Sequence, residues 1–323
     1  METNKIIHGD SLEYMRTLPD KCIDLVLTDP PYFWIVNNDW DNQWATKQEF
    51  ICWLELYTKE WKRILKDNWS LYIFWDDKVT AYVQVMMDKY FKLENSIVWY
   101  KPNNMTIKWW DIFRSYAPVT ERLLFYSNEV LKTWLQEIND NLELYRPIRD
   151  YFVEERKKTK LSYNQINIKC FWTASNWWWM ASNILTGYKN WWTFPTKEKY
   201  EALQKIGICK KQYEELRKQY EELRRPFNPA ENFTDIWTFP ITSEKEKWAW
   251  KHPTIKPLQI FKRIIETSSR EWDLILDCFA WSWTTAVACI ETGRNYIVIE
   301  KEKDYVDIIE NRVANTTPPL FVM

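Results

Sequence analysis

Apolar runs and amphipathic stretches alternate along roughly the first 130 residues. Between residues 5 and 33 the pattern predicts a strand, a short helix and a second strand, CIDLVLTDPPYF, which ends at two prolines. The stretch KQEFICWLELYTKEWKRILKD has the spacing of a long amphipathic helix, and SLYIFWDD, SIVWYKP and RLLFYSN read as three short strands. Strands that alternate with helices predict an α/β sheet with helices on both faces.

The α/β pattern resumes near the C-terminus after a different central region. RPIRDYFVEERKKTKLSYNQINIKCF predicts two helical segments, and NWWWMASNIL follows a turn, which is typical of a helix-turn-helix with its second element near 176–186. The charged run with the near-repeat KQYEELR favours a solvated helix or short coiled coil over a DNA contact. Beyond it, DLILDCF and NYIVIE read as strands, separated by the helical stretch TTAVACIET.

Length and composition bound the class of protein. With 323 residues and 46% hydrophobic content, the chain suits one large domain or a domain with an insertion. No apolar run reaches about 18 residues and the N-terminus lacks the shape of a signal peptide, so we expect no membrane span and a cytoplasmic location. The six cysteines are scattered without a CxxC pair, which argues against a zinc site or a disulfide framework. Because the net charge is −1, any contact with nucleic acid must come from local basic patches.

The tryptophan and glycine counts are abnormal. The chain holds 4 glycines and 23 tryptophans, whereas ordinary usage of about 7% predicts roughly 23 glycines. Trp69 and Trp272 fall at turns next to expected strands, where backbone freedom is favoured over a large ring. One hypothesis is that the gene uses a code in which UGA specifies glycine and was translated as if UGA specified tryptophan. The alternative is a genuinely tryptophan-rich protein, and UGG codons at positions 272, 281 and 283 would decide for it.

The motif TDPPYF, residues 28–33, carries the strongest chemical pattern. It lies at the carboxyl end of an apolar strand, where open α/β sheets bind ligands. The prolines lack N–H donors and leave carbonyl acceptors, Asp29 adds a carboxylate, and Tyr32 or Phe33 offers a ring for stacking. Such a group suits a planar substrate with an amino group, although an isolated motif of this kind is also compatible with a plain turn.

A second loop, DCFAWSWTTAVA at 277–288, joins an expected strand to an expected helix. Loops of this shape cradle nucleotides, and they use glycine where the backbone bends sharply and approaches the ligand. Trp281 and Trp283 stand where those glycines are expected. The loop is therefore either a binding loop with altered residues or no binding loop at all.

Together these motifs resemble those of the β-class amino-group DNA methyltransferases, which use S-adenosylmethionine (S-adenosyl-L-methionine). The resemblance covers roughly 5–130 and 245–315: DPPY matches the catalytic motif, HPTIKP the motif before the cofactor loop, and DCFAWSWTT the pattern D-x-F-x-G-x-G-T-T if Trp281 and Trp283 are glycines. The order of the motifs implies a circularly permuted Rossmann-like methyltransferase sheet. It divides the chain into a catalytic half (1–130), a mostly helical target-recognition insert (131–245) and a cofactor-binding half (246–323).

The resemblance also assigns residues to roles. In the family, the aspartate and first proline of DPPY hold the target base and the tyrosine stacks on it. The acidic residue that ends YIVIE, Glu300, would accept the ribose hydroxyls, and it follows Asp277 by 23 residues, close to the usual interval. A simple turn is an equally good account of Asp10, and His252 is either a pocket residue or the start of a helix. The expected catalytic residues are Asp29, Pro30, Pro31 and Tyr32, and the expected cofactor residues are Asp10, Lys256, Asp277, Phe279, Trp281, Trp283, Thr284, Thr285 and Glu300, with Asp277 and Phe279 lining the methionine and adenine side.

The implied reaction is direct methyl transfer to a base that has left the helix stack, with orientation of the two reactants as the main contribution. No Pro-Cys dipeptide occurs, which argues against methylation of a cytosine ring carbon through a thiolate. In the family, DPPY favours adenine N6 and a serine in the first position favours cytosine N4. The implied partner is double-stranded DNA, with a cognate restriction endonuclease and a monomeric or homodimeric state left open. The candidate phosphate contacts, for which surface solubility is the alternative, are Arg146, Arg149, Arg156, Lys157, Lys158 and Lys160.

Two other functions remain open at this point. The chain could be an amino-group methyltransferase for RNA or for a protein glutamine, although the motif order and the expected helix-turn-helix count against this. It could also be a DNA-binding relic without activity, if Trp281 and Trp283 are real and fill the space of the methionine group. A gene that has lost its function would accumulate substitutions of many kinds, whereas the unexpected residues in this chain are overwhelmingly tryptophan.

Overall fold

The computed structural model of the chain forms two compact units. The first comprises Met1–Leu131 and Pro226–Met323, and the second comprises Lys132–Arg225. The described residues are 1–33, 43–102, 119–128, 145–171, 179–185, 192–223, 226–228, 234–241, 255–282 and 284–317. No helix in this described part of the chain is long and apolar enough to cross a membrane.

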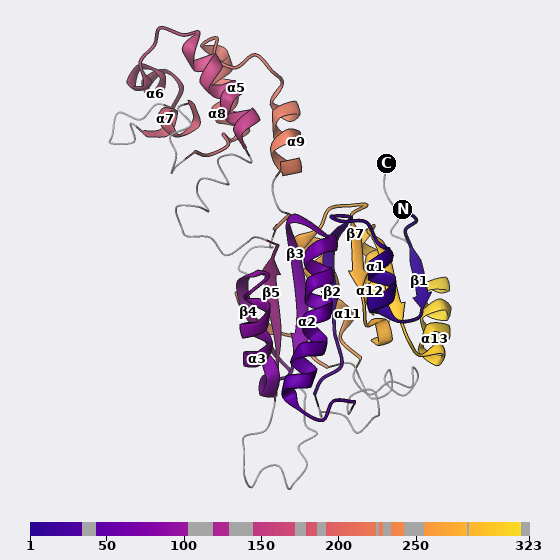
Figure 1. The fold of residues 1–323 in the computed structure, drawn as a ribbon. Helices are drawn as coiled ribbons and strands as arrows, with labels where there is room; N and C mark the ends of the chain where they lie inside the picture. The colour runs from indigo at the N-terminus through magenta and orange to yellow at the C-terminus, as the bar shows by residue number, and fades with distance from the viewer. Residues whose placement is uncertain are drawn as a thin grey trace. The chain divides into compact units, whose positions relative to one another are not determined.

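The first unit is built on one eight-stranded sheet with the order β1-β8-β7-β2-β3-β5-β4-β6 (Figure 1). The first five strands in this order run parallel, β5 runs antiparallel to both β3 and β4, and β6 runs parallel to β4. The strands are β1 Lys5–His8, β2 Ile23–Thr28, β3 Leu65–Trp75, β4 Lys92–Tyr100, β5 Thr120–Ser127, β6 Ile236–Thr238, β7 Leu274–Asp277 and β8 Asn295–Glu300.

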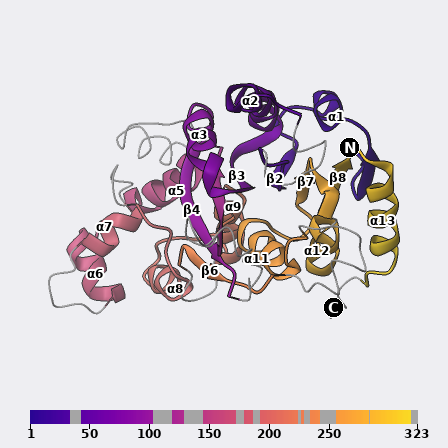
Figure 2. The same cartoon turned by 90° about the horizontal axis from the view of Figure 1, so that it is seen from below.

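Helices cover both faces of this sheet (Figure 2). Side chains alternate along a strand, so in β3 Leu71 and Ile73 pack into one core and Tyr72 and Phe74 into the other. The first core includes α1 (Ser11–Thr17), α2 (Lys47–Ile64) and α3 (Asp77–Met87); the second includes α11 (Leu258–Ser268), α12 (Thr284–Thr292) and α13 (Lys303–Ala314). The α/β sheet with helices on both faces that the sequence predicts is confirmed.

The strand order places a switch point between β2 and β7. These two strands are parallel neighbours, yet the chain leaves β2 through α2 toward β3 and leaves β7 through α12 toward β8. Because α2 and α12 cover opposite faces, the two connections diverge at the carboxyl ends of β2 and β7. Open α/β sheets bind ligands at such points. TDPPY follows β2 and DCFAWS follows β7, so both sequence motifs meet there.

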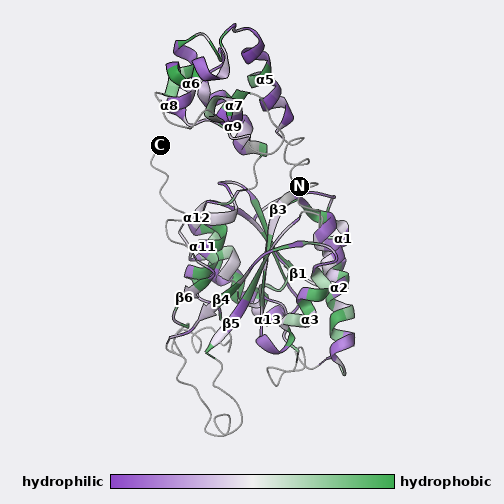
Figure 3. Cartoon of the chain, turned by 90° about the vertical axis from the view of Figure 1, so that its left-hand side faces the viewer, coloured by the Kyte–Doolittle hydropathy of each residue, from purple (hydrophilic) through white to green (hydrophobic). Residues whose placement is uncertain are grey.

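The second unit is helical around its own core. Its helices are α5 (Arg146–Lys157), α6 (Tyr163–Phe171), α7 (Trp179–Leu185), α8 (Lys197–Lys205) and α9 (Tyr213–Leu223). Phe152 and Tyr200 are fully buried in this core. Helices of both units carry hydrophilic as well as hydrophobic residues, as amphipathic helices do (Figure 3).

Two expectations for the insert compare differently with the structure: its C-terminal boundary differs, and its DNA-reading helix stays a prediction. The expected boundary at 245 is too late, because β6 pairs with β4 in the sheet and Arg263 of α11 packs over the rings of Trp237 and Phe239. The expected second helix-turn-helix element corresponds to α7, which packs against α6, and the buried Asn167 side chain accepts a hydrogen bond from the backbone N–H of Ala181 at 2.8 Å. The connection at 172–178 lies outside the described residues, and a DNA-reading role for α7 stays a prediction.

Candidate active site

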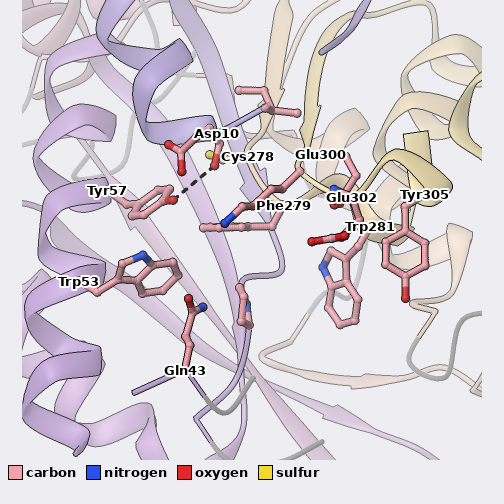
Figure 4. A pocket seen from close by; sticks show the side chains of 14 residues that line it. Asp10, Gln43, Trp53, Tyr57, Cys278, Phe279, Trp281, Glu300, Glu302 and Tyr305 are labelled. Carbon is pink, nitrogen blue, oxygen red and sulfur yellow. Dashed lines mark hydrogen bonds between the residues drawn. The ribbon is translucent and has the colours of Figure 1, made fainter. Parts of the chain in front are cut away.

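A cavity of about 390 Å³ opens at the carboxyl ends of β7 and β8 (Figure 4). Its walls come from the β1–α1 turn, Pro31 after β2, α2 with Gln43 before it, the loop after β7, and the end of β8 with the residues that follow. This volume is in the usual range for a small-molecule site. The side chains that line it include those of Asp10, Trp53, Tyr57, Phe279, Trp281, Glu300, Glu302 and Tyr305.

Aromatic rings form one wall of the cavity. The Phe279 ring lies 5.0 Å from the Tyr57 ring and 5.7 Å from the Trp53 ring, centroid to centroid. Both partners lie on α2, whose N-terminus is capped by the Thr46 hydroxyl through the backbone N–H of Glu49. Burial raises the pKa of Tyr57 to about 12, so its hydroxyl is neutral at physiological pH. The wall is apolar, flat and suited to a purine ring.

Acidic groups also line the cavity. Glu300 ends β8, and its carboxylate is largely buried and accepts the backbone N–H of Glu302 at 2.7 Å. Burial raises the pKa of Glu300 to about 7. Asp10 also lines the cavity while one of its oxygens caps α1 through the N–H of Glu13 at 3.0 Å. Carboxylates beside an aromatic wall fit the ribose and the positive sulfur of an adenosyl sulfonium, and a nucleoside-binding α/β unit carries its acidic residue at the place of Glu300.

Asp277, in contrast, is not part of the cavity wall. Its carboxylate is 1% exposed, and three donors occupy it: the Thr28 hydroxyl at 2.9 Å, the Phe279 N–H at 3.1 Å and the Thr285 hydroxyl at 2.5 Å. Burial raises the pKa of Asp277 to about 6, against the effect of these hydrogen bonds. Asp277 therefore ties the loop after β7 to β2 and to α12; of the two residues expected beside the cofactor, Phe279 lines the cavity and Asp277 does not, and their contacts with the cofactor stay a prediction.

Thr284 and Thr285 are buried at the start of α12 and also hold the loop rather than line the cavity. The Thr284 hydroxyl donates to the backbone carbonyl of Lys256 at 3.4 Å. Trp281, in the short 3₁₀ turn Ala280–Ser282, does line the cavity, and its indole N–H donates to the backbone carbonyl of Asp29 at 2.6 Å. The indole thus lies between the cavity and the catalytic motif. Trp283 and His252 lie outside the described residues.

The DPPY motif holds a buried carboxylate. Asp29 is 1% exposed, and its Oδ1 accepts the Tyr32 hydroxyl at 2.7 Å. Oδ2 forms an ion pair with Lys256 Nζ at 2.9 Å and accepts no well-formed hydrogen bond from the described residues. Pro30 is buried, Pro31 lines the cavity, and the Tyr32 ring packs 5.9 Å from the Trp75 ring.

Lys256 belongs to this carboxylate rather than to the cofactor cavity where it was expected. Its side chain is 3% exposed, and Nζ donates to the Tyr32 hydroxyl at 3.1 Å and pairs with Glu121 Oε2 at 3.3 Å. Glu121 Oε1 accepts Lys101 Nζ at 2.5 Å. Sequence reasoning missed Glu121, and the only sign of it was a charged residue at the start of the apolar strand TERLLFYS.

The charges of this cluster shift one another. Burial raises the pKa of Asp29, and this exceeds the opposite effect of Lys256. Burial alone would lower the pKa of Lys256, but the two carboxylates hold it above its usual range. Burial would raise the pKa of Glu121, but Lys256 and Lys101 together hold it below its usual range. Lys256 and Glu121 are therefore each stabilised in their charged forms, whereas burial works against the ionised form of Asp29.

The candidate phosphate-binding residues lie on and just after α5. Lys157 pairs with Glu154 at 2.6 Å and Lys158 with Glu155 at 2.5 Å, so both ammonium groups already have acidic neighbours. The Arg156 guanidinium lies 4.5 Å from the centre of the Tyr163 ring. These contacts reduce the positive charge that α5 presents.

Comparison with known proteins gives concordant matches. A sequence profile of N6 and N4 methyltransferases, described as DNA methylase, matches residues 23–311. Type II methyltransferase M2.MboI of Moraxella bovis is 25% identical over 330 residues, covering 98% of this chain and 89% of its own. DNA adenine methyltransferase YhdJ of Escherichia coli is 25% identical over 306 residues, covering 94% and 81%.

Solved structures share the fold. A protein named as a DNA modification methylase of Thermus thermophilus, complexed with S-adenosyl-L-methionine, has a TM-score of 0.53 at 18% identity and covers 98% of this chain and 95% of its own. The PvuII DNA methyltransferase, named as cytosine-N4-specific, has a TM-score of 0.55 at 15% identity with the same coverage. The Rossmann-like methyltransferase sheet expected from the sequence is confirmed.

Proposed function

This chain belongs to the N6 and N4 family of DNA methylases, and we propose that it methylates adenine N6 in double-stranded DNA at specific sites. The observation that supports this most strongly is a buried carboxylate oxygen, Asp29 Oδ2. It lies beside the cofactor cavity and can still accept a hydrogen bond. The curated relatives support the base, since YhdJ is named as a DNA adenine methyltransferase.

The cofactor cavity fits S-adenosylmethionine. When bound, this cofactor supplies an electrophilic methyl group on a positive sulfur. The rings of Phe279, Tyr57 and Trp53 would hold its adenine, and Glu300 would accept the ribose hydroxyls. Asp10 and Glu302 add negative charge to the same cavity, which favours a cation.

The catalytic motif would make the target amino group a better nucleophile. Asp29 Oδ2 accepts one of its N–H groups, which draws the nitrogen lone pair out of conjugation with the ring. Tyr32 packs against the base, while its hydroxyl and Lys256 fix the carboxylate in place. After the nitrogen gains the methyl group it must lose a proton, and Asp29 is the nearby base that would accept this proton.

We assign target recognition to the helical unit Lys132–Arg225. The target base must leave the duplex, and a separate unit must hold the duplex while it does so. The packing of α7 against α6, with Asn167 hydrogen-bonded across them, supports α7 as the element that enters the major groove. A cognate restriction endonuclease is part of the proposal, since the relatives include type II methyltransferases.

Cytosine N4 is the second candidate base, because a cytosine-N4-specific enzyme has the same fold. The experiment that separates the two incubates the protein with labelled S-adenosylmethionine and unmethylated genomic DNA, then digests the DNA to nucleosides. Two proteins are compared: the chain with tryptophan at 281 and 283, called the tryptophan form, and the W281G/W283G variant, called the glycine form.

We expect the label in N6-methyladenine, with the glycine form more active because the Trp281 indole stands between the cofactor cavity and Asp29. Label in N4-methylcytosine would mean that cytosine, not adenine, is the target base. Label in RNA or protein, and none in DNA, would contradict the proposal. Codon readings of UGG at positions 281 and 283 would remove the hypothesis of recoded glycine.

A further inference from the structure

Two carboxylates share one buried ammonium group beside the proposed target-base site. Lys256 Nζ lies 2.9 Å from Asp29 Oδ2, 3.3 Å from Glu121 Oε2 and 3.1 Å from the Tyr32 hydroxyl. The contact with the Tyr32 hydroxyl is a hydrogen bond, and the two carboxylate oxygens are held as ion pairs. The acceptors come from β5 and from the loop after β2, which fixes the ammonium between them.

We propose that Glu121 is a positioning residue for methyl transfer, which acts by drawing part of the Lys256 charge away from Asp29 and so leaves Asp29 Oδ2 able to accept the target amino group. This inference rests on the proposed function. Glu121 itself is held by Lys101, whose Nζ contacts its other oxygen at 2.5 Å. Glu121 meets no substrate and acts on Asp29 through Lys256, with a direct effect of its own negative charge beside it.

The charge balance explains why two carboxylates are needed. Without Glu121, Lys256 would pair with Asp29 alone, and the full ammonium charge would weaken Asp29 both as a hydrogen-bond acceptor and as a base. Without Lys256, the buried Asp29 would tend to take up a proton and lose its acceptor oxygen. Together Lys101 and Lys256 neutralise Asp29 and Glu121, so the cluster can be buried.

Few other charged groups act on the cluster. Among the described residues, Asp277 lies near Asp29, and Asp76, which caps α3, lies near Tyr32. The Lys256 ammonium also lies over the rings of Tyr32 and Phe74, at 5.1 and 5.4 Å from their centres. A change at Glu121 therefore reaches Asp29 through Lys256 and directly through the lost or altered negative charge.

The test is the pH profile of single-turnover methyl transfer to genomic DNA by the full chain, in whichever of the tryptophan and glycine forms is more active. For E121Q we expect a rate about tenfold lower, less than the roughly 10²–10⁴-fold expected for loss of an acid–base group. The acid limb of the pH profile, where the rate falls as Asp29 takes up a proton, should move to lower pH by about one unit. The reason is that a negative charge near Asp29 is removed. E121D keeps the charge and should return the limb toward the parent position.

A second variant acts from the other end of the cluster. K101M frees Glu121 to attract Lys256 more strongly, so the acid limb should move to higher pH, opposite to E121Q. This variant keeps the test decisive if E121Q does not fold, which its melting temperature reveals. The matched control is E291Q, which removes the carboxylate of another lysine pair, Glu291 with Lys262 at 3.0 Å, between α12 and α11. Its profile should equal that of the parent.

The failures of the two proposals are distinct. If neither parent form places label in DNA, the proposed function fails. If the parent methylates DNA but E121Q and K101M leave the acid limb in place, or move it in the same direction, Glu121 does not act through the charge of Lys256 and the inference is overturned.

Discussion

Asp29 and Asp277 are the same residue type, at the ends of neighbouring parallel strands, and both are 1% exposed. Their surroundings differ. Three hydrogen-bond donors from β2, the loop backbone and α12 occupy Asp277, whereas Asp29 has one hydroxyl donor and a lysine that it shares with Glu121. Free acceptor capacity, not position at a strand end, thus distinguishes the carboxylate that we propose binds the substrate from the one that holds a loop.

The largest expected effect is at Asp29. D29N keeps the shape of the side chain but removes the charge and the base, so single-turnover methyl transfer should fall by about 10²–10⁴-fold. Binding of S-adenosylmethionine, measured by calorimetry, should change little, because Asp29 does not line the cofactor cavity. Loss of cofactor binding with an unchanged transfer rate would reverse the roles assigned to the two loops.

D277N should act on stability first. An amide replaces one acceptor oxygen with a donor, which leaves Thr28 or Thr285 without its partner and costs about 1–3 kcal/mol in the free energy of unfolding. The pKa of Asp277 is about 6 in the folded protein, above the ordinary value of 3.8. The folded state thus holds more protons between these values, so the parent loses stability as the pH rises through them. Denaturant melts should show a smaller loss in D277N than in the parent, because the raised pKa values of Asp273 and Glu300 contribute the same trend in both.

Glu300 should make cofactor binding depend on pH. Its pKa is about 7, so the carboxylate becomes neutral as the pH falls through that value. Affinity for S-adenosylmethionine, which carries a positive sulfur, should weaken over the same range, and by roughly tenfold at most for each pH unit. E300Q should bind more weakly and lack this dependence. An equally steep dependence in E300Q would assign the effect to another group.

We expect the smallest effect from a substitution at Trp272. This position tests in a turn what Trp281 tests in the loop after β7, namely whether glycine suits the backbone better than tryptophan. Trp272 is 68% exposed and adopts a φ of 71°, a left-handed conformation that a side chain other than glycine rarely takes. W272G should raise the free energy of unfolding by about 1 kcal/mol. The matched control is G293A in the turn after α12, where Gly293 also has a φ of 71° and its carbonyl accepts the Trp272 N–H at 2.9 Å; this variant should lower the free energy of unfolding by a similar amount. A loss of stability in W272G would favour tryptophan as the natural residue.

Local patterns were enough to predict the sheet, because alternating apolar strands and amphipathic helices are properties of short segments. They also placed a carboxylate at the end of β2, where α/β sheets bind ligands. The pattern did not reveal β6, which has only three residues and is ordered by pairing with β4.

The roles within the site depend on contacts across the chain, and the sequence could not supply these. The Thr28 hydroxyl that occupies Asp277 is 249 positions away from it along the chain. Lys256 belongs to an expected cofactor motif, yet it meets Asp29 and Glu121 because α11 and β5 converge on the end of β2. Glu121 has no motif of its own, so only the folded arrangement identifies it.

The comparison of Asp29 with Asp277 is tested most directly by single-turnover methyl transfer to DNA at saturating S-adenosylmethionine, with D29N and D277N measured side by side at a temperature where both are folded. Saturation compensates for a loosened cofactor loop but not for a missing acceptor. We expect D277N to recover most of the parent rate of methyl transfer, while D29N stays about 10²–10⁴-fold slower. Equal rates in the two variants, or a faster D29N, would contradict it.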